Sequence, residues 1–180
     1  MRMKSLLQIV LLSLTAALAG CDGNTPLQKA VIDDNADATK QLLEQGTAVD
    51  ERNKYGWTAL MHAARAGNAA MVELLIERGA DIDAIDTNGR SALIKAAFTG
   101  QTEVVNALLK HGANINLQDA AGRTALHWAI ARGHIEAIET LIAQRADTAL
   151  KTKEGYTPMM LALHEDDGDV ILLLQKLGVR

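Results

Sequence analysis

The fold is decided by residues 122–133, which have the sequence GRTALHWAIARG. The same pattern occurs 33 residues earlier as GRSALIKAAFTG at 89–100, and 33 residues before that as GWTALMHAARAG at 56–67. A degraded copy begins at Gly155, and a fifth begins at Gly23 in the same register. A fixed period of this length is typical of a repeat solenoid, in which each unit packs on its neighbours.

Each copy predicts two short helices followed by a turn. In the second copy, Thr58 is placed to cap a helix over 59–66, and Gly67 to end it. A second helix is expected over 71–77, because its apolar residues recur at helical spacing. The Asp and Asn residues before the next glycine predict a turn-rich hairpin finger. One unit exposes too much apolar surface to stand alone, so we expect the stack to share its stability.

The repeated text resembles the ankyrin repeat, whose pattern is G-x-T-P-L-H-x-A-A-x-x-G-H followed by a second helix that ends in L-L-x-x-G-A. The resemblance covers about 23–180. It implies an all-α ankyrin-repeat solenoid of about five 33-residue helix-turn-helix units with short β-hairpin loops. The repeat domain is expected at 25–180, with repeats at about 24–54, 55–87, 88–120, 121–153 and 154–180.

The fourth repeat departs from this pattern at two positions. Arg145 replaces the glycine found at Gly79 and Gly112. If the backbone there needs a positive φ, Arg costs about 1 kcal/mol or more relative to Gly. Ala149 replaces the Asp or Asn of the earlier repeats. We therefore expect a looser or differently shaped finger between repeats four and five.

Residues 1–20 have the layout of a secretory signal peptide. A basic start is followed by an apolar run of about 13 residues, too short for the roughly 20 that a membrane-spanning helix needs. The sequence LAGC at 18–21 closely resembles the lipobox of bacterial lipoproteins, in which the cysteine is lipidated and the chain is cut just before it. The resemblance implies that Cys21 is a lipid anchor, with a short tether at 21–24. The alternatives are an uncleaved anchor helix or a fortuitous match.

The residue after the cysteine bears on localisation. Asp22 resembles the signal that keeps a lipoprotein of enterobacteria in the inner membrane. We therefore expect a lipid-anchored protein of the bacterial cell envelope, on the periplasmic face of the inner membrane rather than the outer.

Composition and motifs favour a binding module over an enzyme. Removing Arg2 and Lys4 from the 18 basic residues leaves 16 against 22 acidic residues, a net charge of −6, which gives no case for nucleic-acid binding. No catalytic motif, phosphate loop or metal-ligand spacing is found, so no enzyme activity and no cofactor are expected. His127 fits the ankyrin position whose ring hydrogen-bonds neighbouring turns, and Trp128 is interpreted as packing.

The remaining candidate is a surface. In ankyrin proteins the fingers and inner helices contact partners, and by register the partner-binding positions here are Lys54, Tyr55, Trp57, Arg65, Thr87, Asn88, Arg90, Phe98, Thr99, Arg123, Arg132, Lys153, Tyr156 and His164. Four of the five aromatic residues belong to this set, and aromatics and Arg are enriched in binding hot spots. We expect a monomer whose concave face binds an acidic patch on another protein. The alternative is that these residues serve only solubility and packing.

Two biological roles fit such an anchored module. Ankyrin proteins of the bacterial periplasm include ones that accompany stress-defence enzymes such as catalase. Small anchored periplasmic proteins also serve as immunity factors that neutralise toxic hydrolases. A protein with enzyme activity through His127 or His164, and a structural membrane-surface protein without a specific ligand, are the rival classes.

Overall fold

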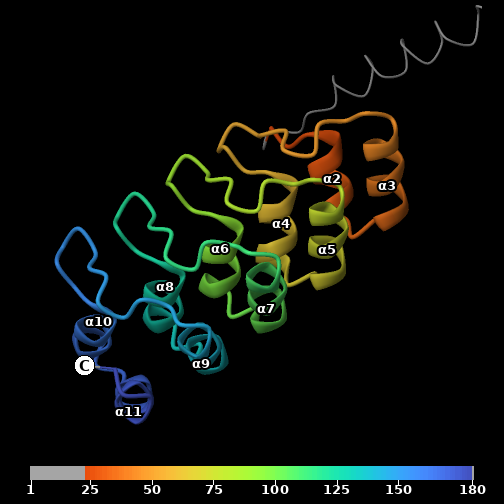
Figure 1. Ribbon diagram of the computed structural model, residues 1–180. Coiled ribbons are helices and arrows are strands. Elements are labelled where there is room, and N and C mark those ends of the chain that lie inside the picture. The colour runs from red at the N-terminus through yellow and green to blue at the C-terminus, as the bar shows by residue number, and fades with distance from the viewer. Residues whose placement is uncertain (1–22, 180) are drawn as a thin grey trace, which may run out of the picture.

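The computed structural model describes residues 23–179, which form a stack of helix pairs (Figure 1). This part of the chain contains ten helices: α2 (Pro26–Ile32), α3 (Ala36–Glu44), α4 (Ala59–Ala66), α5 (Ala69–Glu77), α6 (Ala92–Phe98), α7 (Thr102–Lys110), α8 (Ala125–Ala131), α9 (Ile135–Ala143), α10 (Pro158–Glu165) and α11 (Gly168–Lys176). The fold is the all-α solenoid of paired helices that the period predicts.

The helices form two rows (Figure 1). We call α2, α4, α6, α8 and α10 the inner helices, and α3, α5, α7, α9 and α11 the outer helices. Each inner helix packs on the next inner helix and on its own outer partner, and α5, α7 and α9 pack in sequence. Between consecutive pairs the chain extends as a long loop, and these loops lie side by side as fingers (Figure 1).

Capping residues set the start of every inner helix. The hydroxyls of Thr25, Thr58, Ser91, Thr124 and Thr157 each accept the amide of the residue three positions on. These are the capping positions that the sequence predicts. The expected start of the second helix at Met71 is wrong by two residues. Asn68 caps α5 by accepting the amide of Met71, which moves the first helical residue to Ala69.

The core repeats with the sequence. Leu60, Leu93 and Leu126 of the inner helices are all fully buried. Outer helices contribute similarly buried side chains, such as Leu75 and Leu108. Each helix therefore removes its apolar face from water against the adjacent repeat, and the stack is one continuous core.

The fingers are tight turns, and no residue between 23 and 179 is assigned to a strand. Each finger after the first donates one amide to the carbonyl of the finger before it, as Ala120 does to Asn88 at 2.8 Å. The finger between repeats four and five makes the same bond, from Lys153 to Ala121 at 2.9 Å, so the expectation of a looser finger is wrong. In this finger Thr152 stands at the position equivalent to Asp119, and its hydroxyl accepts the amide of Tyr156 at 3.2 Å.

The structure also shows the backbone at the two positions where repeat four departs from the pattern, Arg145 and Ala149. Arg145 has φ of 64°, so the positive φ is present and the conformational cost of a non-glycine residue applies. At the Ala149 position, Asp50, Asp83 and Asn116 each accept the amide 31 residues further along the chain. For Ala149 that amide would belong to residue 180, outside the described residues.

The last repeat leaves apolar side chains uncovered. Leu163 and Leu172 are 57% and 65% exposed. Leu163 occupies the position of Ile130, which the following repeat buries, so its exposure results from the end of the stack. Leu172 occupies a position that is polar in the other repeats, for example Glu139.

Candidate functional site

Most of the predicted partner-binding residues lie on one surface, built by the inner helices and the adjoining fingers. The centre of this surface is a group that we call the aromatic–arginine strip: Trp57, Arg65, Arg90, Lys95, Phe98, Arg123, Trp128 and Arg132. Finger residues supply Trp57, Arg90 and Arg123, and α4, α6 and α8 supply the others, with Arg132 at the C-cap of α8.

One half of the strip surrounds the Trp57 ring. The Lys95 ammonium lies 3.6 Å from the centroid of this ring, and the Arg65 guanidinium lies 5.5 Å from it. His62 packs against the same ring with a centroid separation of 4.8 Å. These distances are within the range of cation–π attraction, which holds the cations beside a half-buried indole.

The other half surrounds an aromatic pair. Phe98 and Trp128 meet edge to face, with their centroids 5.2 Å apart. Arg90 and Arg123 lie over the Trp128 ring at 4.5 and 4.8 Å, and Arg132 lies over Phe98 at 4.1 Å. Stacked guanidinium groups keep their N–H edges free to bind carboxylates, because stacking uses only the planar face.

Two finger carboxylates fix the strip in place. Asp86 accepts the amides of Asn88 and Arg90 with one oxygen and the Lys95 ammonium, at 2.7 Å, with the other. Asp119 repeats this arrangement 33 residues later, with the Trp128 indole N–H as the donor at 2.9 Å. The fingers are thereby tied to the helices that carry the strip.

Asp86 and Lys95 form a buried ion pair. Burial raises the pKa of Asp86, but hydrogen bonds from Lys95 and from the finger amides outweigh it and leave the pKa below its usual value. Burial lowers the pKa of Lys95 from its high ordinary value, and its hydrogen bond to Asp86 opposes that change. The attraction between the two groups thus offsets part of the cost of burying their charges.

The strip carries a net positive charge. Its five cations meet three carboxylates, through the pairs Lys95–Asp86 at 2.7 Å, Arg90–Asp119 at 3.5 Å and Arg123–Glu154 at 3.8 Å. Across the described part of the chain, Arg65 and Arg132 form no ion pair. The Nε atoms of Arg90 and Arg123 make no hydrogen bond within residues 23–179.

Two hollows adjoin Trp57. The first has a volume of about 240 Å³ and is lined by Trp57, Arg65, Arg90, Ile94, Lys95 and Phe98. The second, of about 300 Å³, shares Trp57 and Arg65 but is otherwise lined by Asn24, Asn53, Tyr55, His62 and Asn88. The first hollow is thus aromatic and cationic, whereas the second is rich in neutral amide side chains.

The other predicted residues lie around the strip or are engaged within the fold. Tyr156 packs on His164 with centroids 5.1 Å apart, further along the stack. The Thr87 hydroxyl donates to the Tyr55 carbonyl, and the Thr99 hydroxyl donates to carbonyls that include that of Arg65. At the fingers, three further predicted residues are exposed: Lys54, Asn88 and Lys153.

Sequence reasoning missed two members of the strip. Trp128 packs against the core, as the sequence predicts, and its ring also lies between Arg90 and Arg123 at the surface, which the sequence analysis does not predict. Lys95 was not assigned at all. The register position holds Lys29, His62, Lys95, Trp128 and Leu161 in the five repeats, and Lys95 and Leu161 are buried there, so its composition gave no clear signal of a surface position.

His127 has the structural role that the sequence predicts. Its Nε2 contacts the Tyr156 carbonyl at 3.2 Å, and its Nδ1 accepts the Thr124 amide at 3.2 Å. Burial lowers the pKa of His127 below its ordinary value. The ring is therefore neutral at pH 7, with both nitrogens used inside the fold.

Several expectations concern residues or groups that the structure does not describe. The signal peptide at 1–20 and the lipidation site Cys21 lie outside the described residues. Within 23–179, no helix is long and apolar enough to cross a membrane. The same residues contain no group of three or more His, Cys, Asp or Glu side chains placed to hold a metal ion.

A family model described as "Ankyrin repeats (3 copies)" matches the sequence in four overlapping segments, at 3–86, 36–119, 81–152 and 115–180. No curated protein matches the chain.

Proposed function

Because the chain belongs to the ankyrin-repeat family, whose domains typically act as non-catalytic binding scaffolds, we propose that it binds a protein partner through the aromatic–arginine strip. The observation that carries this proposal is the concentration of three aromatic rings and four arginines on one accessible surface. Aromatic and arginine side chains are the types most enriched in interface hot spots.

The charge of the strip defines the kind of partner. The whole chain has a net charge of −4, yet the strip has more cations than carboxylates. An acidic patch on a protein would pair with the unpaired guanidinium groups of Arg65 and Arg132. Such complementarity raises the association rate and selects against basic partners.

We further propose that the protein is a lipoprotein of the bacterial envelope, anchored through Cys21 on the periplasmic face of the inner membrane. The support is the sequence LAGC at 18–21 and the Asp that follows it. Labelling cells with a tagged fatty acid, alongside a Cys21→Ser variant, tests the anchor. Label in the variant, or none in the unaltered protein, would contradict it.

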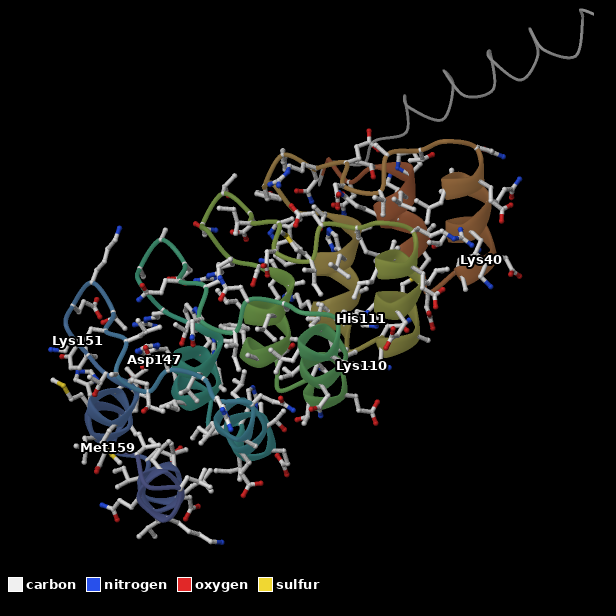
Figure 2. The ribbon with its side chains drawn as sticks, viewed as in Figure 1. Lys40, Lys110, His111, Asp147, Lys151 and Met159 are labelled. Atoms are coloured by element: carbon white, nitrogen blue, oxygen red, sulfur yellow. The ribbon has the colours of Figure 1, made fainter. Side chains whose placement is uncertain are left out.

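Affinity capture from periplasm and solubilised membranes tests the binding function. The bait is residues 22–180, compared with a variant carrying Trp57→Ala, Arg90→Glu and Arg123→Glu. The control carries Lys40→Glu and Lys110→Glu on the outer helices α3 and α7 (Figure 2), which makes the same charge change away from the strip. Circular dichroism confirms that all three baits are folded.

We expect a partner that the unaltered and control baits retain and the strip variant loses. Equal retention by all three would contradict binding through the strip. The partner's identity then separates the two roles: a stress-defence enzyme such as catalase indicates an accessory factor, and a toxic hydrolase indicates an immunity protein.

A further inference from the structure

We propose that the hollow between α4 and α6 receives an Asp or Glu side chain of the partner, seated between the Trp57 and Phe98 rings. We call this hollow the carboxylate pocket; its lining is Trp57, Arg65, Arg90, Ile94, Lys95 and Phe98. This inference rests on the proposed function and names the anchor residue that the strip recognises.

The arginines of the pocket have hydrogen-bonding capacity to spare. Arg65 is exposed and forms no ion pair within residues 23–179. The Nε of Arg90 is buried and faces Asp119 at 3.5 Å, so only the terminal nitrogens of this guanidinium are offered to a ligand. Lys95 is buried and donates to Asp86, so it adds positive charge beneath the pocket rather than an exposed donor. An incoming carboxylate can accept from both guanidinium groups, and charge-assisted bonds of this kind are about twice as strong as neutral ones.

The walls of the pocket strengthen these bonds. The rings of Trp57 and Phe98 and the side chain of Ile94 present apolar surface around the cations. Water is displaced from such a site when a side chain enters, and the lower local dielectric increases the attraction between opposite charges. The methylene groups of Asp or Glu would lie against the rings while the carboxylate meets the arginines.

The neighbouring hollow does not compete for the acidic residue. Apart from Trp57 and the shared Arg65, its lining consists of amide, phenol and imidazole side chains. We therefore place the acidic residue on the Phe98 side of Trp57.

A single-stranded nucleic acid is the other ligand that aromatic rings and arginines can bind, by base stacking and phosphate contacts. The strip suits it poorly. Asp86, Asp119 and Glu154 lie among the cations and would repel successive phosphates. A partner with one carboxylate at the pocket fits this alternation of charge better than a continuous polyanion does.

Selection from a random peptide library displayed on phage tests the pocket, with purified residues 22–180 as the target. We expect enriched peptides to carry Asp or Glu beside an apolar residue. In a synthetic version of an enriched peptide, replacing that acid by its amide should weaken binding about tenfold or more. Fluorescence polarisation of the labelled peptide measures the affinity.

Variants of the protein test whether the preference for the acidic peptide arises at the pocket arginines. The double variant Arg65→Gln, Arg90→Gln should lose the preference for the acidic peptide over its amide form. The matched control is Arg78→Gln, an exposed arginine at the end of α5, which should keep the preference. Asp119 is left unchanged, so the finger keeps its hydrogen bonds to the amides of Ala121 and Arg123.

The outcomes separate the two proposals. Peptides that need the strip but bind equally well as amides would overturn the carboxylate pocket and leave the proposed function standing. Peptides indifferent to Trp57→Ala, Arg90→Glu and Arg123→Glu, or a library that yields no binder, would contradict both. An unstructured single-stranded DNA oligonucleotide that binds the strip and displaces the peptides would also overturn both.

Discussion

At the scale of single residues, His127 connects stability to pH. Its neutral ring accepts the Thr124 amide and contacts the Tyr156 carbonyl, and burial lowers its pKa. The unfolded chain, with an ordinary His pKa of about 6.5, therefore binds a proton before the folded chain does. The stability that His127 contributes is present above this pH and is lost as the pH falls toward the lowered pKa.

The first repeat supplies the control for this prediction. Gln28 occupies the same register position and donates to the Trp57 carbonyl at 2.7 Å, while its side-chain oxygen accepts the Thr25 amide at 3.2 Å. We expect the free energy of unfolding of His127→Gln at pH 8 to lie within about 1 kcal/mol of that of the unaltered protein. As the pH falls below 6.5, the free energy of unfolding should decrease less for the variant than for the unaltered protein. The difference between the two should grow by at most about 1.4 kcal/mol per pH unit. Urea unfolding across this pH range measures the free energy of unfolding of both proteins. If it depends on pH in the same way for both, His127 is not the titrating group.

Arg145 is a residue under conformational strain. Its φ of 64° lies in the left-handed region, where the equivalent residues are Gly46, Gly79, Gly112 and Gly178. We expect Arg145→Gly to raise the free energy of unfolding by roughly 1 kcal/mol, after the gain is reduced by the greater freedom of glycine in the unfolded chain. Urea unfolding at neutral pH measures this difference.

The reverse substitution checks the cause. A Cβ at Gly112 would meet no atom within 4 Å, so Gly112→Arg adds backbone strain without a clash. It should lower stability by a similar amount. Were Arg145→Gly to destabilise the protein instead, contacts of the Arg145 side chain would outweigh the strain.

Sequence reasoning at this scale succeeded where one residue type has one physical reason. A hydroxyl before a helix and a glycine after it could be assigned from the pattern, because capping depends on nearby backbone groups. It was incomplete for Trp128, because a large aromatic side chain suits both a core and a surface. Only the fold shows that the Trp128 ring meets Arg90 and Arg123 in addition to packing against the core.

At the scale of elements, the finger aspartates join each turn to the inner helix that follows it. Asp119 accepts the amides of Ala121 and Arg123, the indole N–H of Trp128 and, more distantly, the charge of Arg90. We expect Asp119→Ala to lower the free energy of unfolding by roughly 3 kcal/mol, because several partly buried donors lose their acceptor together.

The first finger shows which substitution at residue 119 should be tolerated. Asn53 stands at this position in the first finger and accepts the amides of Tyr55 and Trp57 through its side-chain oxygen. Asp119→Asn should therefore keep the turn and cost roughly 1 kcal/mol, mostly through weaker bonds to Trp128 and Arg90. Urea unfolding of both variants measures the difference; equal losses would mean that the carboxylate charge, not the turn, dominates.

Element boundaries were harder to predict than element type. The period fixed the order of helices, but the start of α5 depends on a side-chain bond from Asn68 that a hydrophobic pattern does not reveal. The finger between repeats four and five kept its shape because a Thr hydroxyl can accept the amide that an Asp carboxylate accepts elsewhere. Substitutions that differ in chemistry can thus be equivalent in hydrogen bonding.

At the scale of the whole molecule, the stack brings residues 33 apart in sequence onto one surface. The strip exists because every repeat presents the same register positions on the same side, so Trp57, Phe98 and Trp128 gather although they belong to three different repeats. The fold, and the placement of these side chains on one surface, could therefore be predicted from the period. The pocket beside Trp57 could not, because it depends on which side chains of adjacent repeats meet.

The beginning of the stack limits how the protein sits at a membrane if Cys21 is its anchor. Asn24 is buried and accepts a hydrogen bond from the Asn53 side chain at 2.7 Å, so the repeat stack already includes this residue. The two residues between Cys21 and Asn24 leave a tether of at most about 10 Å. A short tether holds the strip at a high effective concentration near a membrane-bound partner.

Lengthening this tether tests the geometry. A Gly-Ser linker inserted between Asp22 and Gly23 leaves Asn24 in its place within the stack. For a partner in the same membrane, we expect less partner to be captured by cross-linking in intact cells, because effective concentration falls as a flexible linker grows. Capture from a detergent extract should be unchanged, since the binding surface is intact. Unchanged cross-linking in cells would show that the partner reaches the strip independently of the membrane, as a soluble periplasmic protein would.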